Sequence, residues 1–309
     1  MPRRAAGSRG VGVALVLAAA VLWSTGGIGI KSLSGSPLAI AGWRGLFALP
    51  VLSGMVFVRA RGRGSAVQIP LRKPWAWIGA ASYAVMVICY VVATRRTTAA
   101  NAIFIQYTSS AYVALLSWPL LRERVSRMDA IACIGVLLGM VLFFCESLSA
   151  EARIGNLVAV VSSFGATGLP LALRADQRAL SRAGDLRAAA VSPALMIALG
   201  NLMAVLLCVP AMRASPPVDA RSWSLLAALG LGQIALPYIL YGLAIPRLTA
   251  LEGTLVPALE PILNPVWVAL GTGEKPGPLA MVGGGFVLGS VLLQAVAGRR
   301  RSPGEVAEA

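Results

Sequence analysis

Glu260 is the residue whose type and surroundings are best suited to chemistry. It lies about ten residues, or about 15 Å of helix, into an apolar stretch, where a carboxylate could bind a cationic group or carry a proton. Pro257, Pro261 and Pro265 surround it, and each removes an amide donor and disturbs a helix. A helix broken there would expose backbone groups to a ligand. The alternative is that Glu260 stays protonated, or caps the freed amides, and only holds the kink.

Arg44 is the basic residue that lies inside an apolar stretch. It could pair with the carboxylate of a ligand or with Glu260, or it could bond to helix-end carbonyls and extend outward. Asn264 follows Glu260 by one helical turn and joins the predicted binding residues. Glu252 lies on a similar side near the end of the stretch, which predicts a solvated residue at the edge of a gate.

Side chains with polar tips recur at helical spacing in three other apolar stretches. They are Tyr83, Met86 and Tyr90 in one, Gln233, Pro237, Tyr238 and Tyr241 in another, and Asn101, Gln106, Tyr107, Ser109 and Ser110 in the third. Such groups suit a pocket for a small amphipathic ligand, although helix packing, interface belts and hydrogen bonds between helices use the same residues. The predicted binding set is Tyr83, Tyr90, Gln106, Tyr107, Ser110, Gln233, Tyr238, Tyr241, Glu260 and Asn264.

Other kinds of site lack their residues. The chain has no histidine, and its four cysteines lie inside apolar stretches without metal-ligand spacing. We therefore expect no metal, no cofactor and no enzyme activity. Gly135-x-x-x-Gly139 and Gly285-x-x-x-Gly289 are typical of helix packing and could form a homodimer face; neither resembles a phosphate loop.

The elements that position these residues follow from composition. Of the 309 residues, 57% are apolar and 13% charged, and the mean hydropathy is +0.77. Several apolar blocks are long enough to cross a bilayer as helices. The net charge of +15 lies mostly between these blocks, beside lipid head groups, so we do not expect nucleic-acid binding. The predicted spans are Gly10–Ile30, Pro37–Val58, Trp75–Thr94, Thr98–Leu121, Met128–Glu146, Ile154–Leu173, Ala190–Met212, Trp223–Ala244, Ala250–Gly271 and Pro278–Ala297.

The segments between the spans alternate in charge. The two tails and every second loop carry far more Lys and Arg than the other loops, which predicts that both termini are cytoplasmic. The first span is too long for a typical signal peptide and is expected to be retained. We therefore predict a multi-pass protein of the cell inner membrane.

The two halves of the chain resemble each other. One constant shift places Tyr90 on Tyr241, Arg96 on Arg247, Thr98 on Thr249 and Glu123 on Glu274, all of them identities. Each half would hold five spans, and an odd number makes the second copy inverted, as in many secondary transporters. The predicted repeats are residues 1–149 and 150–309 of an all-α membrane protein with ten transmembrane helices.

These segments resemble the drug/metabolite transporter superfamily, in its EamA-type branch. The resemblance rests on Leu22-Trp23-Ser24-Thr25-Gly26, on Arg44, on Thr98-Ala99-Ala100 through Tyr107 to Trp118-Pro119-Leu120-Leu121-Arg122-Glu123, and on Leu259-Glu260-Pro261, Gly273-Glu274-Lys275-Pro276 and Gly283-Gly284-Gly285. It covers nearly the whole chain and implies two inverted five-helix repeats around a central pathway. Ala166 departs from the pattern, since many members place Trp there, and this weakens the expectation that its helix lines the pathway.

The resemblance implies a secondary transporter that moves a small organic metabolite, an amino acid or similar, by alternating access, with export as the expected direction. Its expected partners are the small-molecule substrate, the lipid bilayer and a proton that could couple through Glu260. A non-transporting membrane sensor or assembly protein is the alternative function. A membrane enzyme would have to work without histidine, and sugar-phosphate exchange would need more basic residues in the pathway than Arg44.

Overall fold

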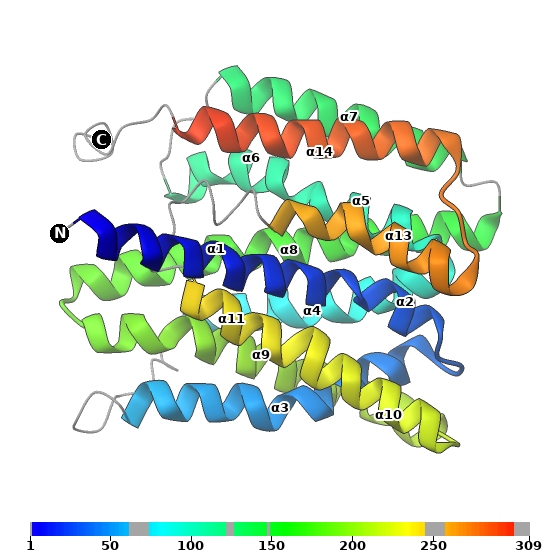
Figure 1. The fold of residues 1–309 in the computed structure, drawn as a ribbon, viewed down its shortest axis with the longest axis horizontal. Helices are drawn as coiled ribbons and strands as arrows, with labels where there is room; N and C mark the ends of the chain where they lie inside the picture. The colour runs from blue at the N-terminus through cyan, green and yellow to red at the C-terminus, as the bar shows by residue number, and fades with distance from the viewer. Residues whose placement is uncertain (1, 62–73, 122–126, 147–148, 245–256, 300–309) are drawn as a thin grey trace.

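A computed structural model describes residues 2–61, 74–121, 127–146, 149–244 and 257–299, and within these ranges the regular structure is helical (Figure 1). The helices of the first half are α1 (Pro2–Ser24), α2 (Gly26–Lys31), α3 (Pro37–Arg61), α4 (Pro74–Arg96), α5 (Ala99–Tyr107), α6 (Ser109–Leu121) and α7 (Arg127–Glu146). The second half holds α8 (Ala150–Arg182), α9 (Leu186–Ala214), α10 (Ala220–Ala228), the π-helix η1 (Leu229–Ala235), α11 (Leu236–Ala244), the 3₁₀ turn η3 (Pro257–Leu259), α13 (Glu260–Thr272) and α14 (Pro278–Arg299).

Six stretches in the described part of the chain are long and apolar enough to cross a membrane. They are Gly10–Lys31, Pro37–Arg61, Pro74–Arg96, Ala150–Arg182, Ala188–Ala214 and Ala220–Ala244, and shorter apolar helices run over Ala130–Cys145 and Pro278–Ser290. Ten spans were predicted. The predicted fourth span is divided into α5 and α6 at Thr108. Of the predicted ninth span, only the later part lies in the described residues, where it forms η3 and α13.

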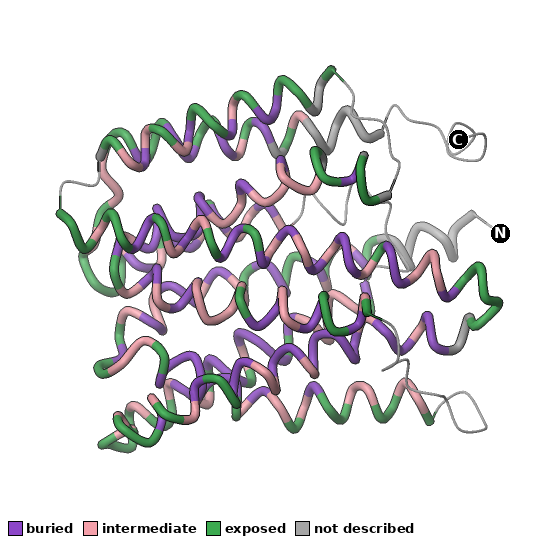
Figure 2. The backbone as a smooth tube through the Cα atoms, turned by 180° about the vertical axis from the view of Figure 1, so that it is seen from behind, coloured by how far each residue is buried: buried purple, intermediate pink, exposed green. Residues whose placement is uncertain are grey.

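The distribution of side chains is that of a membrane protein. Large apolar residues such as Leu207 and Leu270 are 68% and 75% exposed on the outside of the bundle. Buried positions lie mainly in the interior of the bundle and exposed ones toward its outside (Figure 2). Polar residues such as Asn156 and Ser162 are fully buried and find hydrogen-bond partners there. Apolar side chains on the outer surface can contact lipid tails. Polar groups find no hydrogen-bond partner in lipid, so they are buried between helices, which they hold together. The chain is therefore a multi-pass membrane protein.

Local sequence explains where several helices start and stop. The side chains of Thr98, Ser149, Asp185 and Asp219 each accept a hydrogen bond from the amide three residues later, which satisfies a free donor in the first helical turn. α13 ends at Gly273, whose φ of 76° is left-handed and easily adopted only by glycine. α1 and α2 are separated by a turn at Thr25.

The two halves pack against each other throughout the bundle. α1 packs on α11 and α4 on α8, so that the first helix of each half contacts the third helix of the other. α3 packs on α9, α5 on α13 and α7 on α14, and each pair joins a helix of the first half to a helix of the second. α1 begins and α14 ends on the same side of Figure 1, and α2 and α13 end on the opposite side, which we call the Lys31 end.

The glycine motifs lie on α7 and α14. A Cβ atom on Gly139 would lie 2.6 Å from the Gly283 carbonyl oxygen, and one on Gly283 would lie 2.8 Å from the Gly139 carbonyl oxygen. Gly135 faces Ser290 of α14 just as closely. The close contact of Gly135 and Gly139 is therefore made within the chain, whereas Cβ atoms on Gly285 and Gly289 would meet nothing within 4 Å.

Candidate functional site

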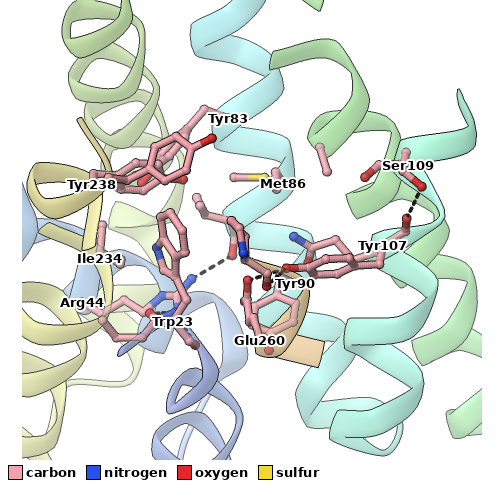
Figure 3. Close-up of a pocket in the computed structure, with 17 residues that line it drawn as sticks. Trp23, Arg44, Tyr83, Met86, Tyr90, Tyr107, Ser109, Ile234, Tyr238 and Glu260 are labelled. Carbon is pink, nitrogen blue, oxygen red and sulfur yellow. Dashed lines mark hydrogen bonds between the residues drawn. The ribbon is translucent and has the colours of Figure 1, made fainter. Parts of the chain in front are cut away.

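A cavity of about 410 Å³ lies between helices from both halves of the chain (Figure 3). Its lining residues are Trp23, Arg44, Tyr83, Met86, Val87, Tyr90, Gln106, Tyr107, Ser109, Ser110, Ala166, Gln233, Ile234, Tyr238, Tyr241, Pro257 and Glu260. They come from α1, α3, α4, α5, α6, α8, η1, α11, η3 and α13. A volume of this size is within the range of small-molecule sites.

Arg44 brings a positive charge to the cavity wall from the first half of α3. Its side chain is 2% exposed. The guanidinium donates hydrogen bonds to Gln233 Oε1 at 3.2 Å and to the carbonyl oxygen of Val87 at 3.3 Å, and both acceptors are neutral. No carboxylate within the described ranges forms an ion pair with it. Its charge is thus anchored by neutral groups and left available to an anion.

Gln233 lies on the π-helix η1, where the wider helical turn departs from the regular α-helix on either side. While Oε1 accepts from Arg44, Nε2 donates to the Trp23 carbonyl oxygen at 3.4 Å. A Cβ on Gly26 would lie 2.8 Å from Nε2, so a side chain at this position would displace the amide from its present place. Gln233 therefore links the Arg44 charge to the junction of α1 and α2.

Glu260 brings the second ionisable group, from the first residue of α13. The Tyr107 hydroxyl lies 2.9 Å from Glu260 Oε2 and 3.0 Å from the Pro257 carbonyl oxygen. A phenol has one hydrogen to donate, so it serves one of these two acceptors at a time. Pro261 has no amide hydrogen to donate to the Pro257 carbonyl oxygen, which therefore stays available to the same phenol as the carboxyl group.

Aromatic rings form the wall near Arg44. The Trp23 and Tyr238 ring centroids are 5.4 Å apart, those of Trp23 and Tyr241 are 5.6 Å apart, and those of Tyr83 and Tyr238 are 5.8 Å apart. Edge-to-face and tilted arrangements at such distances are favourable, and they hold the rings in place. The rings offer an apolar surface with polar tips beside the two ionisable groups (Figure 3).

The structure brings most of the predicted binding residues to this one cavity. Of the predicted set, Tyr83, Tyr90, Gln106, Tyr107, Ser110, Gln233, Tyr238, Tyr241 and Glu260 line it, and so does Arg44. Asn264 does not line it; its side-chain amide donates to the Tyr90 hydroxyl at 2.8 Å and supports a lining residue from behind. Glu252 lies outside the described residues.

Some lining residues were not in the predicted set. Trp23 belongs to the first-helix motif Leu22-Trp23-Ser24-Thr25-Gly26, but its position in the cavity depends on packing against Tyr238 and Tyr241. Ala166 lines the cavity too, so the departure from Trp does not remove α8 from it. Its small side chain leaves room that Trp would fill.

Within the described residues, no group of three or more His, Cys, Asp or Glu side chains gathers around one point. The cavity wall offers a ligand one cationic group, one carboxyl group, amides, hydroxyls and aromatic faces.

Three comparisons relate the chain to known proteins. The sequence model of the EamA-like transporter family matches residues 10–145 and 180–295. A solved structure, described as the crystal structure of a protein, aligns with a TM-score of 0.62 at 19% identity, covering 95% of this chain and 100% of that chain. At that identity the likeness concerns the fold alone. No curated protein matches the sequence.

Proposed function

Because the chain belongs to the EamA-like transporter family, a family of membrane transporters of small molecules, we propose that it exports an amino acid or a similar metabolite. Transport would cross the inner membrane as secondary transport by alternating access. The proposal rests on the cavity and its two ionisable groups, on the pairing of the two halves, and on the charges of the segments between spans.

The observation that carries the proposal is the pair of charged side chains in one cavity. Arg44 has only neutral hydrogen-bond partners within the described ranges, so a carboxylate ligand would supply the missing negative charge. Glu260, on α13, would face the amino group of the same ligand. An amino acid carries both groups, and the rings of Trp23, Tyr238 and Tyr241 would contact its apolar part.

Alternating access is supported by how the halves pair. Exchanging the halves converts the contact of α1 with α11 into that of α8 with α4, and it maps the pairs α3 with α9 and α7 with α14 onto themselves. Inverted repeats produce such pairing, and they let each copy adopt the conformation of the other in turn. We infer that residues 1–149 and 150–309 are these repeats, each with five membrane-crossing segments.

Proton coupling would use Tyr107 and Glu260. When Glu260 is ionised, the phenol donates to the carboxylate. When Glu260 is protonated, the carboxyl group can donate to the phenol oxygen, and the phenol hydrogen then turns to the Pro257 carbonyl oxygen. Both protonation states are therefore fully hydrogen-bonded, which is what a site that takes up and releases a proton inside a membrane requires.

Orientation follows from the basic residues. The tails and alternate loops rich in Lys and Arg would lie in the cytoplasm, so both termini would be cytoplasmic and the Lys31 end external. Export would then move the ligand from the cavity out through the Lys31 end.

The test compares metabolites outside cells that overexpress the intact chain, an Arg44→Ala/Glu260→Ala variant, or a Glu151→Ala/Arg213→Ala control. The control removes the same two charges from exposed positions. At equal protein abundance, an amino acid or similar zwitterion should accumulate outside with the intact chain and the control, and not with the cavity variant. Identical profiles for all three would contradict the proposal.

A further inference from the structure

An ion pair closes the Lys31 end of the bundle. Lys31 Nζ, at the end of α2, lies 2.6 Å from Glu274 Oε2, two residues beyond α13. The two side chains are only 17% and 25% exposed. The pair joins the first half of the chain to the second at the end of the bundle.

Both charged groups also bind backbone. Lys31 Nζ donates to the Thr97 carbonyl oxygen at 2.8 Å, and the Ala99 amide donates to Glu274 Oε1 at 2.7 Å. The Ala99 amide belongs to the first turn of α5, where a carboxylate is favourable. We call Lys31, Thr97, Ala99 and Glu274 the latch, because these residues tie α2, α4, α5 and α13 together.

On each of three helices, a buried polar side chain lies between a cavity residue and the latch along the chain, and we call these three side chains the polar layer. Along α4, Thr94 lies one turn beyond the cavity residue Tyr90 and just before Thr97. On α13, Asn264 lies one turn beyond Glu260 on the way to Glu274. On α5, Asn101 lies between Ala99 and the cavity residue Gln106. Each helix thus follows the same order from cavity to polar layer to latch.

The polar layer is incompletely hydrogen-bonded in the closed arrangement. Thr94 and Asn264 are fully buried and Asn101 is 4% exposed. Within the described ranges the side-chain oxygens Asn101 Oδ1 and Asn264 Oδ1 have no hydrogen-bond partner. A buried acceptor without a partner is costly, whereas the same group beside water or a polar solute is not. If a route opened along these side chains, water or a polar solute would supply the hydrogen bonds that they lack.

α2 contacts the polar layer at Asn264 through a glycine. Gly27 packs so closely on Asn264 that a Cβ would clash with it, and that Cβ would also lie 2.9 Å from Val268. A one-residue turn at Thr25 lies between α1 and α2, and a hinge at this turn would let the six-residue segment tilt. α2 also contacts α13 through Ile28, whose side chain packs so closely on Gly271 that a Cβ there would clash with it.

We propose that the cavity opens at the Lys31 end by separation of α2 from α13, along a route lined by Thr94, Asn101 and Asn264, and that the latch is its gate. The gate deepens the proposed function, on which it rests, by assigning the exit of an exported molecule. A permeating zwitterion would meet amide and hydroxyl groups on its way, and then the separated charges of Lys31 and Glu274.

The test measures how fast a membrane-impermeant maleimide, added to intact cells, labels a cysteine at Thr94→Cys, after subtraction of labelling in the parent chain. Adding Glu274→Gln should raise the rate roughly tenfold, the effect of weakening closure by about 1.4 kcal/mol. Glu151→Gln, the same change at an exposed position, should leave it unchanged. An equal rate in all three would overturn the gate.

A second pair of variants avoids the ion pair altogether. Gly27→Ala introduces a Cβ against Asn264 and should also accelerate labelling, whereas Gly10→Ala, whose Cβ would meet nothing within 4 Å, should not. If neither Glu274→Gln nor Gly27→Ala accelerates labelling while the chain still exports its metabolite, the gate is wrong and the proposed function stands. If labelling responds as expected and no metabolite is exported, the gate stands and the proposed function fails.

Discussion

The guanidinium of Arg44 donates a 3.2 Å hydrogen bond to Gln233 Oε1, across 189 positions of the chain. This contact holds a buried positive charge with a neutral amide. A carboxylate at position 233 would hold the same charge in an ion pair instead. Replacing Gln233 by Glu therefore tests whether Arg44 binds a ligand or only supports the fold.

Gln233→Glu should therefore remove the site for an anionic group. The new carboxylate would neutralise Arg44 and should weaken binding of a carboxylate ligand by at least about tenfold, or about 1.4 kcal/mol. The measurement is ligand affinity of the purified protein by isothermal titration, with Gln106→Glu as a control for adding a carboxylate elsewhere in the cavity. Unchanged affinity in Gln233→Glu would mean that Arg44 serves only the fold.

Glu260→Gln should abolish movement driven by a pH gradient without changing protein abundance, because an amide cannot take up and release the coupled proton. Counterflow, which needs no net proton movement, should persist in proteoliposomes. Full gradient-driven transport by the variant would rule out coupling through Glu260.

Tyr107→Phe should lower gradient-driven transport to a smaller degree than Glu260→Gln. It removes the hydroxyl that serves Glu260 and the Pro257 carbonyl oxygen, but it leaves the carboxyl group in place. Tyr112→Phe makes the same chemical change at a hydroxyl that does not line the cavity and lies 3.9 Å from the Met140 sulfur. Initial rates at several external pH values should differ between these two variants; equal profiles would argue against a role for the phenol.

Gly139→Val should destabilise the protein by about 1–3 kcal/mol, because the added atoms would collide with the Gly283 carbonyl oxygen on α14. Gly285→Val enters open space and should stay within about 0.5 kcal/mol of the parent. Thermal unfolding in detergent compares them. A change in oligomeric state with Gly285→Val alone would instead support a dimer through Gly285 and Gly289.

Asn156→Leu should cost about 1–3 kcal/mol of stability, because it removes hydrogen bonds to the Thr97 hydroxyl, the Asn101 amide and the Phe143 carbonyl oxygen inside the bundle. Leu157→Ala, at a neighbouring side chain that is 57% exposed, is the matched control. A melting temperature as high as that of the control would show that water replaces the lost partners.

The membrane class and most of the cavity could be predicted from sequence. Apolar stretches and helical spacing are local properties, so Tyr83 and Tyr90, or Gln233 and Tyr241, could be placed on common faces before any fold was known. Glu260 stood out because a carboxylate inside an apolar stretch needs a reason to be there. Those faces meet because a polar stripe on a membrane helix has to turn away from lipid.

Which polar groups touch was decided only by the tertiary structure. Nothing in the local sequence distinguishes Trp23 as a cavity residue, or Asn264 as a support for Tyr90 behind the wall. The pairing of Lys31 with Glu274 likewise joins residues of different halves, and each of them resembles an ordinary charge at a span end. Periodicity determines which face of a helix is polar, but the azimuth and depth at which two such faces meet depend on packing between helices far apart in the chain.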